Sequence, residues 1–554
     1  MSSFVSPTYP YRRSPDQDAR QRARHKVAII GAGPVGLTLA IDLARRGVPV
    51  VVLDDDNTVS VGSRAICHAK RTLEIWSRLG CVGPMMAKGI TWQTGKVFFR
   101  DRPVFGFDLM PEGGHAFPAF INLQQYHVEQ ILVEAALKID RLDLRWKNRV
   151  DAISPRAEGA TVTIETPDGP YAIDADWVVA CDGVRSPSRK TLGLDFRGKV
   201  FEDRFLIADV RMKADFPIER WFWFQPPFHA GGSALLHKQA DDVWRIDLQL
   251  GWSADPEEER KPEKVIPRLK TMLGPQAKFD LEWVSVYTFQ CRRLEKFRHG
   301  RVIFAGDAAH QVSPFGARGG NSGVQDADNL AWKLAAVIDG RAPEALIDSY
   351  GFEREMAADE NIRHSTRSTD FITPKGDASH LFRDAVLSLA RTHLFARRMV
   401  NSGRLSKATI LADSPLNTPD RDDFMGGVAP GAPAADAPVH YDAAPGWLLN
   451  AIDGRFTGLY FTDGAPESNV ARALARLDDG PVPIRTLAVS PRPAVASGGI
   501  ELALDVEGLA ARRYDARAGT YYLFRPDQHV AARWRTPDPA AIAAARERAL
   551  ARND

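Results

Sequence analysis

A glycine-rich turn between an apolar strand and an apolar helix is the feature that most constrains this chain. The run Lys26-Val27-Ala28-Ile29-Ile30 predicts a buried strand, and Gly31-Ala32-Gly33-Pro34-Val35-Gly36 follows it directly. Gly31 permits a tight turn, Gly33 lets the backbone approach a pyrophosphate, and Gly36 lets the helix and strand pack closely. A second apolar strand over 48–53 ends in Asp54, whose carboxylate can accept hydrogen bonds from ribose hydroxyls. Together these features predict an α/β unit that binds a dinucleotide.

The composition excludes several classes of protein. The chain has 554 residues, enough for about three to four domains, and a net charge of +2 provides no basic face for a nucleic acid. Four cysteines lie far apart, at 67, 81, 181 and 291, which predicts reduced thiols and no metal site. The sequence has no apolar run long enough to cross a membrane. We expect a cytoplasmic protein in which the polar residues 1–24 form a disordered leader.

Two further motifs indicate which dinucleotide is bound. The run Trp177-Val178-Val179-Ala180-Cys181-Asp182-Gly183 predicts a strand that ends in Asp-Gly. A later stretch begins with Gly306-Asp307-Ala308-Ala309-His310 and continues through Pro314 and Gly319-Gly320-Asn321 to Asp326. In this order, the three motifs resemble those of the class A flavoprotein aromatic hydroxylases, a group that includes para-hydroxybenzoate hydroxylase, phenol hydroxylase and 3-(3-hydroxyphenyl)propionate hydroxylase. The resemblance covers roughly residues 25–400 and implies FAD as the cofactor.

The resemblance also implies roles for individual residues. Asp307 would bond the ribityl chain of FAD, Arg64 would lie by the pyrophosphate, and Gln125 would touch the ribityl or phosphate region. Asp182 and Gly183 would lie near FAD and the path of the nicotinamide. The expected cofactor-binding residues are Gly31, Gly33, Pro34, Gly36, Asp54, Arg64, Gln125, Asp182, Gly183, Asp307, Gly319, Gly320 and Asn321.

The activity implied by the resemblance is the hydroxylation of a small phenolic aromatic. NADPH or NADH would reduce FAD as a transient co-substrate, O₂ would form a flavin C4a-hydroperoxide, and the substrate ring would attack it. The turn 319–323 would open a helix whose positive end favours the reduced flavin anion. Two other interpretations stay open. One is a related monooxygenase that epoxidises or oxygenates a larger polycyclic or non-phenolic substrate, and the other is a non-catalytic flavin-binding regulator.

Residues 199–298 are expected to form an antiparallel substrate-binding sheet, because short strands rich in aromatic and β-branched residues follow one another there. By resemblance, Tyr287 would orient the substrate and the carbonyl group of Pro314 would face it. Related phenol hydroxylases carry an acid shortly after the arginine of the second-strand loop, but Arg64-Ala65-Ile66-Cys67-His68 contains none. His68 is therefore a candidate proton acceptor, with a structural loop histidine as the alternative. Strand alternation alone does not decide which of five further candidates face the substrate: Trp221, Trp223, Gln225, His229 and His237.

The fold class expected is α/β: a Rossmann-type FAD-binding domain interleaved with an antiparallel-sheet substrate domain, followed by a C-terminal thioredoxin-like domain. The FAD-binding domain is expected over 25–198 and 299–400, the second part including additional helices. Residues 401–446 are rich in Gly, Pro, Ala and Asp and predict a linker. Residues 447–554 resemble the thioredoxin-like domain of phenol-hydroxylase-type enzymes. No cysteine follows Cys291, so this domain can carry no redox dithiol, and we expect it to serve packing or a homodimer contact.

Overall fold

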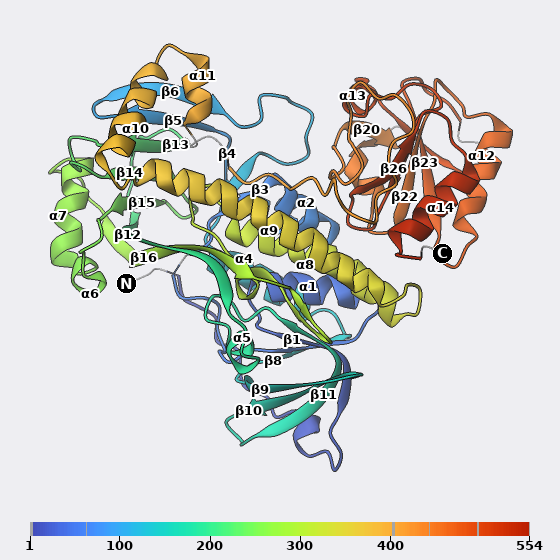
Figure 1. Ribbon diagram of the computed structural model, residues 1–554, viewed down its shortest axis with the longest axis horizontal. Coiled ribbons are helices and arrows are strands. Elements are labelled where there is room, and N and C mark those ends of the chain that lie inside the picture. Colours follow the sequence, from blue (N-terminus) through green and yellow to red (C-terminus); the bar gives the residue numbers. More distant parts are fainter. Residues whose placement is uncertain (1–3, 63, 401–404, 442–443, 496–497, 553–554) are drawn as a thin grey trace.

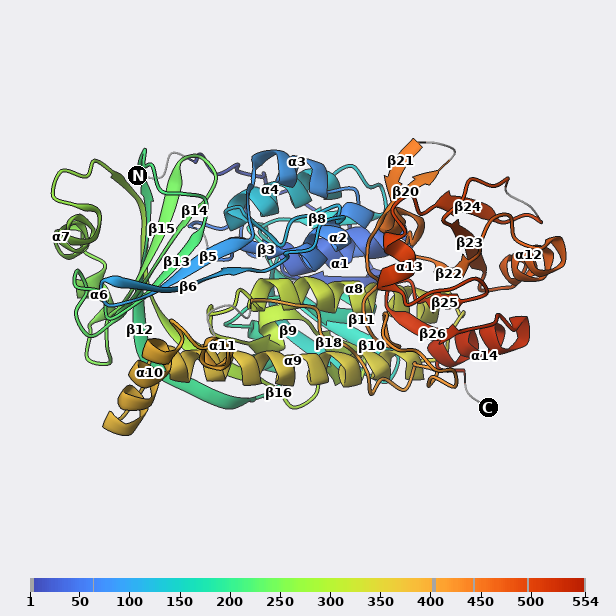
Figure 2. The same cartoon turned by 90° about the horizontal axis from the view of Figure 1, so that it is seen from above.

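The computed structural model describes residues 4–62, 64–400, 405–441, 444–495 and 498–552. Figures 1 and 2 show three bodies in a row, with a sheet-rich body at one end, a central α/β body, and a C-terminal body at the other end. The fold class is α/β, as the sequence predicts. Within the described ranges, no helix is both long and apolar enough to span a membrane.

The central body is built on a parallel sheet. Its strands lie in the order β18-β11-β1-β2-β8, and each neighbouring pair is parallel. The strands are β1 (Arg24–Ile30), β2 (Val50–Leu53), β8 (Leu142–Arg145), β11 (Tyr171–Ala180) and β18 (Val302–Phe304). Strands β1, β2, β11 and β18 end in continuous buried apolar runs, as expected for strands covered on both faces, whereas β8 at the edge does not. Helix α1 (Pro34–Arg45) packs against both α4 (Gln125–Ala136) and α8 (Gly319–Ile338).

Smaller elements complete the central body. A hairpin of β9 (Arg149–Arg156) and β10 (Gly159–Glu165) pairs with β11, and β17 (Arg298–His299) pairs with β18. A separate small sheet has the order β3-β7-β4. The other elements are β3 (Cys67–Ala69), α2 (Lys70–Arg78), α3 (Val82–Lys88), β4 (Ile90–Trp92), β7 (Phe120–Asn122), α5 (Pro187–Thr191) and the 3-10 turn η2 (Gly306–Ala308).

The sheet-rich body has the strand order β19-β16-β12-β15-β14-β13-β5-β6. Its strands are β5 (Thr94–Phe99), β6 (Arg102–Asp108), β12 (Phe196–Arg211), β13 (Arg220–Phe224), β14 (Ser233–Lys238), β15 (Val243–Gln249), β16 (Asp280–Leu294) and β19 (His310–Gln311). The expected boundaries of 199–298 are therefore too narrow, because β5 pairs with β13 from a part of the chain assigned to the FAD-binding domain. Helices α6 (Pro256–Glu259) and α7 (Pro262–Leu273) lie between β15 and β16 in the chain, and α7 buries Val265 and Leu269 against one face of the sheet.

A long helix, α9 (Ala345–Ile372), follows α8 and runs along the central body toward the sheet-rich end (Figure 2). Helices α10 (Asp377–Leu389) and α11 (Leu394–Met399) lie beyond it at that end (Figure 1). The end of α9 joins the apolar core of the sheet-rich body through Ile372, which packs with Phe222 and Phe315 among others. This helix therefore connects the two ends of the molecule.

The C-terminal body is a mixed sheet with the order β21-β20-β24-β23-β22-β25-β26. Its strands are β20 (Pro438–Tyr441), β21 (Ala444–Trp447), β22 (Phe456–Phe461), β23 (Ile484–Ser490), β24 (Glu501–Leu504), β25 (Tyr521–Phe524) and β26 (Val530–Trp534). Its helices are α12 (Ser468–Ala475), α13 (Leu509–Arg513) and α14 (Pro539–Ala549), with 3-10 turns η4 (Leu448–Ala451) and η5 (Arg476–Asp478). Strands β22, β23 and β24 are parallel, and β25 and β26 add antiparallel pairs.

The segment expected to be a linker is part of this C-terminal body in its described portion. Thr418 N–H donates to the Ala531 carbonyl group at 2.8 Å, and Leu411 N–H donates to the Gly431 carbonyl group at 2.8 Å. A Cβ on Gly431 would lie 2.2 Å from the Leu411 oxygen, so this glycine serves a close backbone approach. Its composition therefore reflects tight packing rather than a flexible tether, and the linker prediction is wrong there.

The described part of the expected leader, residues 4–24, is also packed rather than disordered. The 3-10 turn η1 (Pro15–Gln17) is capped by Ser14, and Asp16 pairs with His25 at 2.8 Å and with Arg145 at 2.7 Å. Tyr9 stacks on Trp146 with ring centroids 4.8 Å apart. These contacts explain why a polar composition does not leave the segment free: its charges meet partners on the central body.

Candidate active site

The glycine-rich turn leaves space for a ligand at one glycine and none at the other two. A Cβ on Gly31, whose φ is +102°, would lie 2.6 Å from the Cys181 carbonyl oxygen, and a Cβ on Gly36 would lie 2.0 Å from the Gly31 oxygen. A Cβ on Gly33 would meet no protein atom within 4 Å. Gly33 caps α1, Pro34 is its first residue, and no side chain caps that end. The N-terminus of α1 therefore opens onto space that suits a phosphate group.

Asp54 closes this turn from the end of β2. Its carboxylate accepts hydrogen bonds from Ala32 N–H at 2.5 Å and Asp56 N–H at 2.9 Å. Burial raises the pKa of Asp54 to about 6, although both hydrogen bonds oppose the shift. The carboxylate thus holds the backbone of the glycine-rich turn, and its spare lone pairs remain for a ribose hydroxyl.

Asp182 and Gly183 lie beside the same turn, at the end of β11. A Cβ on Gly31 would lie 3.2 Å from the Asp182 Cα atom, which places the two segments in contact. One Asp182 oxygen, Oδ2, accepts from Ser188 N–H at 2.9 Å, while Oδ1 is buried and has no partner among the described residues. A buried acceptor without a donor calls for an explanation, and a hydroxyl or N–H group of a bound ligand would provide one.

Asp307 and the start of α8 form a second part of the site. The Asp307 side chain is exposed and accepts no hydrogen bond from the described residues, while Gly319 and Gly320 begin α8 without a side-chain cap. A Cβ on Gly319 would lie 3.9 Å from Asp307 Oδ1, and one on Gly320 would lie 3.4 Å from Ala65 Cβ. Surrounding protein nevertheless desolvates Asp307 and raises its pKa, and the positive charge of the nearby Arg64 opposes this. The fold therefore brings Arg64, Asp307 and the α8 N-terminus together.

Gln125 acts on the loop that carries Arg64. Its Oε1 atom accepts from Ala65 N–H at 3.0 Å, and its Nε2 atom donates to Glu129 at 2.7 Å. Glu129 in turn accepts from Ser60 N–H at 2.6 Å. Gln125 and Glu129 thus fasten both sides of the Arg64 loop to α4.

Asn321 has a structural role that the sequence did not reveal. Its Oδ1 atom accepts from Ala69 N–H at 2.8 Å and from Thr72 at 2.7 Å, and its Nδ2 atom donates to the carbonyl groups of Cys67 and Ala317. The side chain is 2% exposed. The side chain of Asn321 thus uses its hydrogen-bonding capacity within the protein, so the predicted contact of Asn321 with the cofactor is left to its backbone.

Asp326, the last residue of the third motif, anchors the turn that carries Asp307. Its buried carboxylate accepts from Gly306 N–H at 2.9 Å, His310 Nε2 at 2.7 Å and Arg354 Nε at 2.6 Å. Burial alone would raise the pKa of Asp326, but His310 and Arg354 outweigh it and the pKa is lowered. This cluster fixes the turn that presents Asp307.

The register of the sheet-rich body shows which side chains face the central body. Asp209 pairs with Arg245, and His237 pairs with Arg245 from the other side, so these three share one face. The same face carries Phe222, which belongs to the core around Phe315. Trp223 belongs to the opposite core, which α7 covers, and Trp221 stacks against neighbouring rings there. Of the open candidates, His237 therefore faces inward, whereas Trp221 and Trp223 do not.

A cavity lies between this inner face and the turn after residue 313. We call it the sheet recess. It is narrow and partly open to solvent, with a cavity volume of about 20 Å³, and is lined by Phe107, Arg220, Phe222, Phe315, Gly316, Ser368, Ile372 and Leu405. Pro314, just before the lining residues, is exposed, and its carbonyl group accepts from Ala317 N–H at 3.0 Å. The recess thus joins an aromatic wall to the segment that leads into α8.

The two remaining catalytic candidates differ in their placement. Tyr287 pairs with Phe205 on the inner face and is half-buried; burial raises its pKa, and the charges of Arg64 and Arg245 oppose the shift. His68 points into the core of the central body, where it packs on Trp76 and bonds the Leu123 carbonyl group at 3.1 Å. Burial lowers its pKa to about 4. The proposal that His68 accepts a proton from the substrate is therefore not supported, and the structural alternative accounts for its contacts.

Comparison with known proteins agrees with this geometry. The FAD binding domain family model matches residues 24–365. The 6-methylpretetramide 4-monooxygenase of Streptomyces rimosus is 32% identical over 524 residues, covering 92% of this chain and 90% of that protein. The 3-(3-hydroxy-phenyl)propionate/3-hydroxycinnamic acid hydroxylase of Mycolicibacterium smegmatis is 30% identical over 364 residues, which span 65% of this chain and 64% of that protein.

A solved structure shares the whole fold. The flavin-dependent monooxygenase PieE, solved with FAD and substrate, superposes with a TM-score of 0.78 over 96% of this chain and 99% of that one, at 22% identity. At this identity the match supports the fold alone. The family model, however, covers more than half of the chain, and the glycine-rich turn, Asp182 and Asp307 leave space and unpaired groups that fit FAD. The chain therefore belongs to the FAD-binding family of class A aromatic hydroxylases and is an FAD-dependent aromatic monooxygenase.

Proposed function

We propose that this enzyme hydroxylates a phenolic aromatic substrate, using O₂ and a reduced nicotinamide as co-substrates. The observation that carries the proposal is the sheet recess. Phe107, Phe222 and Phe315 offer it aromatic walls, which favour a flat aromatic ring, and Arg220 adds a positive charge. The recess adjoins the turn before α8, the segment next to which the flavin ring is expected.

The residues of the chain bind and orient the reactants. Gly33 and the α1 N-terminus would hold the pyrophosphate, Asp182 and Asp307 would accept hydrogen bonds from hydroxyl groups of FAD, and the positive end of α8 favours an anionic flavin. When bound, FAD supplies hydride acceptance and oxygen activation. The apolar walls of the recess exclude water and hold the substrate ring.

A second candidate substrate class is a larger polycyclic aromatic. One observation favours it: the Streptomyces rimosus relative named for 6-methylpretetramide matches over 90% of its length, including the C-terminal body. The relative named for 3-(3-hydroxy-phenyl)propionate matches over 64% of its length. A polycyclic phenol would fit both the phenolic and the polycyclic proposal, so the number of rings in the substrate is the variable to test.

The test is consumption of NADH and of NADPH by the purified flavoprotein across monocyclic and polycyclic phenols, with hydrogen peroxide and hydroxylated product quantified together. A phenol that accelerates oxidation and yields product in proportion supports the proposal and identifies the ring size. Slow oxidation with peroxide for every phenol would contradict the phenolic substrate.

A further inference from the structure

One carboxylate on the inner face of the sheet-rich body has no hydrogen-bonding partner among the residues that the structure describes. Asp247 lies in β15, opposite Ile207 of β12 and Leu235 of β14. Neither of its oxygens accepts a hydrogen bond from the described residues, and Oδ1 is buried. A buried carboxylate oxygen without a donor is costly for a fold and calls for an explanation, and a catalytic role is one such explanation.

Arg220 lies on the same face, and its side chain also has no partner in the described part of the chain. It lines the sheet recess at 8% exposure, and it forms no ion pair or hydrogen bond through its side chain within the described ranges. Arg245 behaves differently, because its Nε and Nη2 atoms donate to the two oxygens of Asp209, each at 2.8 Å. The fold therefore neutralises Arg245 internally, whereas Arg220 lies in the recess wall and Asp247 lies on the same face of the sheet, paired with Leu235, which in turn pairs with the recess residue Phe222.

Asp247 also lies close to the loop segment in which related phenol hydroxylases carry an acid. Cys67, from that segment, approaches His237 with Sγ 3.9 Å from Nδ1, and both Arg220 and Asp247 act on the charge of its thiol. The segment itself has no acid. Strand β15 thus places the carboxylate of Asp247 near this segment, from the side of the sheet-rich body.

We propose that Asp247 is the base that accepts the hydroxyl proton of the phenolic substrate, with Arg220 facing the resulting oxygen anion. This rests on the proposed function. The substrate O–H bond breaks, a new O–H bond forms on the Asp247 carboxylate, and the electron pair stays on the substrate oxygen, so total charge is unchanged. The phenolate ring is more electron-rich than the phenol and reacts more readily with an electrophilic oxygen.

The charged and titratable surroundings of Asp247 support this role. Burial raises its pKa to about 6, while Arg245 of its own strand and Arg220 of β13 lower it and Asp209 of β12 raises it. On β14, His237 is held neutral because burial and both arginines lower its pKa well below the usual value. Asp247 is therefore ionised at neutral pH, yet basic enough to take a proton.

The test uses the FAD-loaded enzyme and 4-nitrophenol, whose ionised form absorbs visible light and whose neutral form does not. Wild type and Asp247→Asn are titrated with this probe across pH, as difference spectra against enzyme alone, and probe-stimulated NADPH oxidation is measured. The control is Asp242→Asn, an exposed aspartate of the same hairpin that pairs with Lys238. Its φ of +54° suits asparagine. Flavin content confirms that each variant is folded.

We expect Asp247→Asn to keep FAD, to raise the apparent pKa of the bound probe by at least one unit, and to slow stimulated oxidation by about 100-fold or more. The control should match wild type. If Asp247→Asn equals wild type in both readouts, the assignment of Asp247 as the base is overturned, while the proposed function is unaffected. Probe ionisation that depends on Asp247 in an enzyme that hydroxylates no phenol would support the assignment and reject the proposed function.

Discussion

The attachment of the C-terminal body to the central body gives a sharp stability prediction at Glu353. This carboxylate is fully buried in α9 and accepts from Lys333 Nζ at 2.6 Å, Arg525 Nη1 at 2.5 Å and Asn329 Nδ2 at 2.7 Å. Burial alone would raise the pKa of Glu353, but Arg525 and Lys333 hold it far below its usual range. The perturbation is Glu353→Gln, which removes the charge and keeps the shape.

The magnitude follows from what the variant leaves behind. Lys333 and Arg525 would remain buried with a single carboxylate, Asp527, which already pairs with Arg525 at 2.5 Å. The N–H groups of the glutamine amide would also face the N–H groups of Lys333 and Arg525, which are donors themselves and cannot accept a hydrogen bond. Removing one partner of a buried ion pair costs about 3–5 kcal/mol, and because Asp527 remains we expect the lower end, about 3 kcal/mol.

The assay follows hydrogen exchange of the β25 and β26 amides together with urea unfolding of the FAD-loaded protein, since a local probe remains valid if unfolding is not two-state. The matched control is Glu344→Gln, which breaks partly exposed pairs with Arg298 and Arg301 and should cost less than about 1 kcal/mol. Adding Lys333→Met to Glu353→Gln should restore part of the loss, because it removes the unpaired cation. Equal losses for Glu353→Gln and its control would refute the reasoning.

Three further predictions concern the site and pH. Gly33→Ala should fold normally but lose FAD, because the added Cβ meets only the space for the ligand. Gly36→Ala should lose FAD and also about 1–3 kcal/mol of stability, because its Cβ meets the Gly31 oxygen. Thermal melts and flavin absorbance distinguish the two variants, and equal melting temperatures would contradict the prediction. Asp307→Ala should weaken FAD binding about 10- to 100-fold without changing the melt of the apoprotein, measured by flavin titration, and full flavin retention would reject its role. The pKa of about 4 for folded His68 means that only the unfolded chain takes up its proton between pH 6.5 and 4, so stability falls by about 3 kcal/mol on acidification through that window. His68→Gln should flatten this dependence in urea titrations, and an unchanged slope would disprove it.

The central body was predictable because its signals are local. Each glycine of the turn has a steric task set by neighbours within the same strand–turn–helix unit, and the observed clearances at Gly31, Gly33 and Gly36 match those tasks. The alternation of the sheet-rich body predicts two faces, but the pairing that orients them is non-local. Strand β5 reaches β13 from more than a hundred residues earlier in the chain, which no local pattern encodes.

The side chains of the site were less predictable for a related reason. An asparagine at the start of a helix can face either a ligand or the protein, and Asn321 faces the protein because β3 presents the unpaired N–H of Ala69 and the carbonyl group of Cys67 there. The composition of 405–441 reads as a linker because glycine serves both flexible chains and close packing. Asp247 carries no motif, and only the strand register places it on the inner face.

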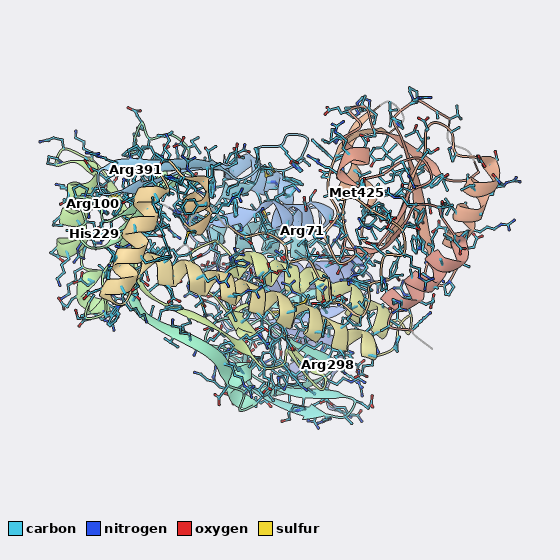
Figure 3. The ribbon with its side chains drawn as sticks, turned by 45° about the horizontal axis from the view of Figure 1, so that its top comes forward. Arg71, Arg100, His229, Arg298, Arg391 and Met425 are labelled. Atoms are coloured by element: carbon cyan, nitrogen blue, oxygen red, sulfur yellow. The ribbon has the colours of Figure 1, made fainter. Side chains whose placement is uncertain are left out.

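The position of α9 has a consequence for building hybrids of this enzyme with its relatives. At 28 residues it spans about 42 Å, with Glu353 in the buried charge cluster near one end and Ile372 in the wall of the sheet recess at the other. Figure 3 shows Arg71 in the central body, on the side next to the C-terminal body. Its guanidinium group stabilises the same junction, because it donates to Gln528 at 2.8 Å and to Asp328 at 3.0 Å. A C-terminal body taken from another family member would therefore need matching charges on α2, α8 and α9. The unit to exchange is therefore the whole assembly of these three helices with the loop 525–529. A fusion point near residue 405 would also alter the substrate recess, because Leu405 is part of its wall.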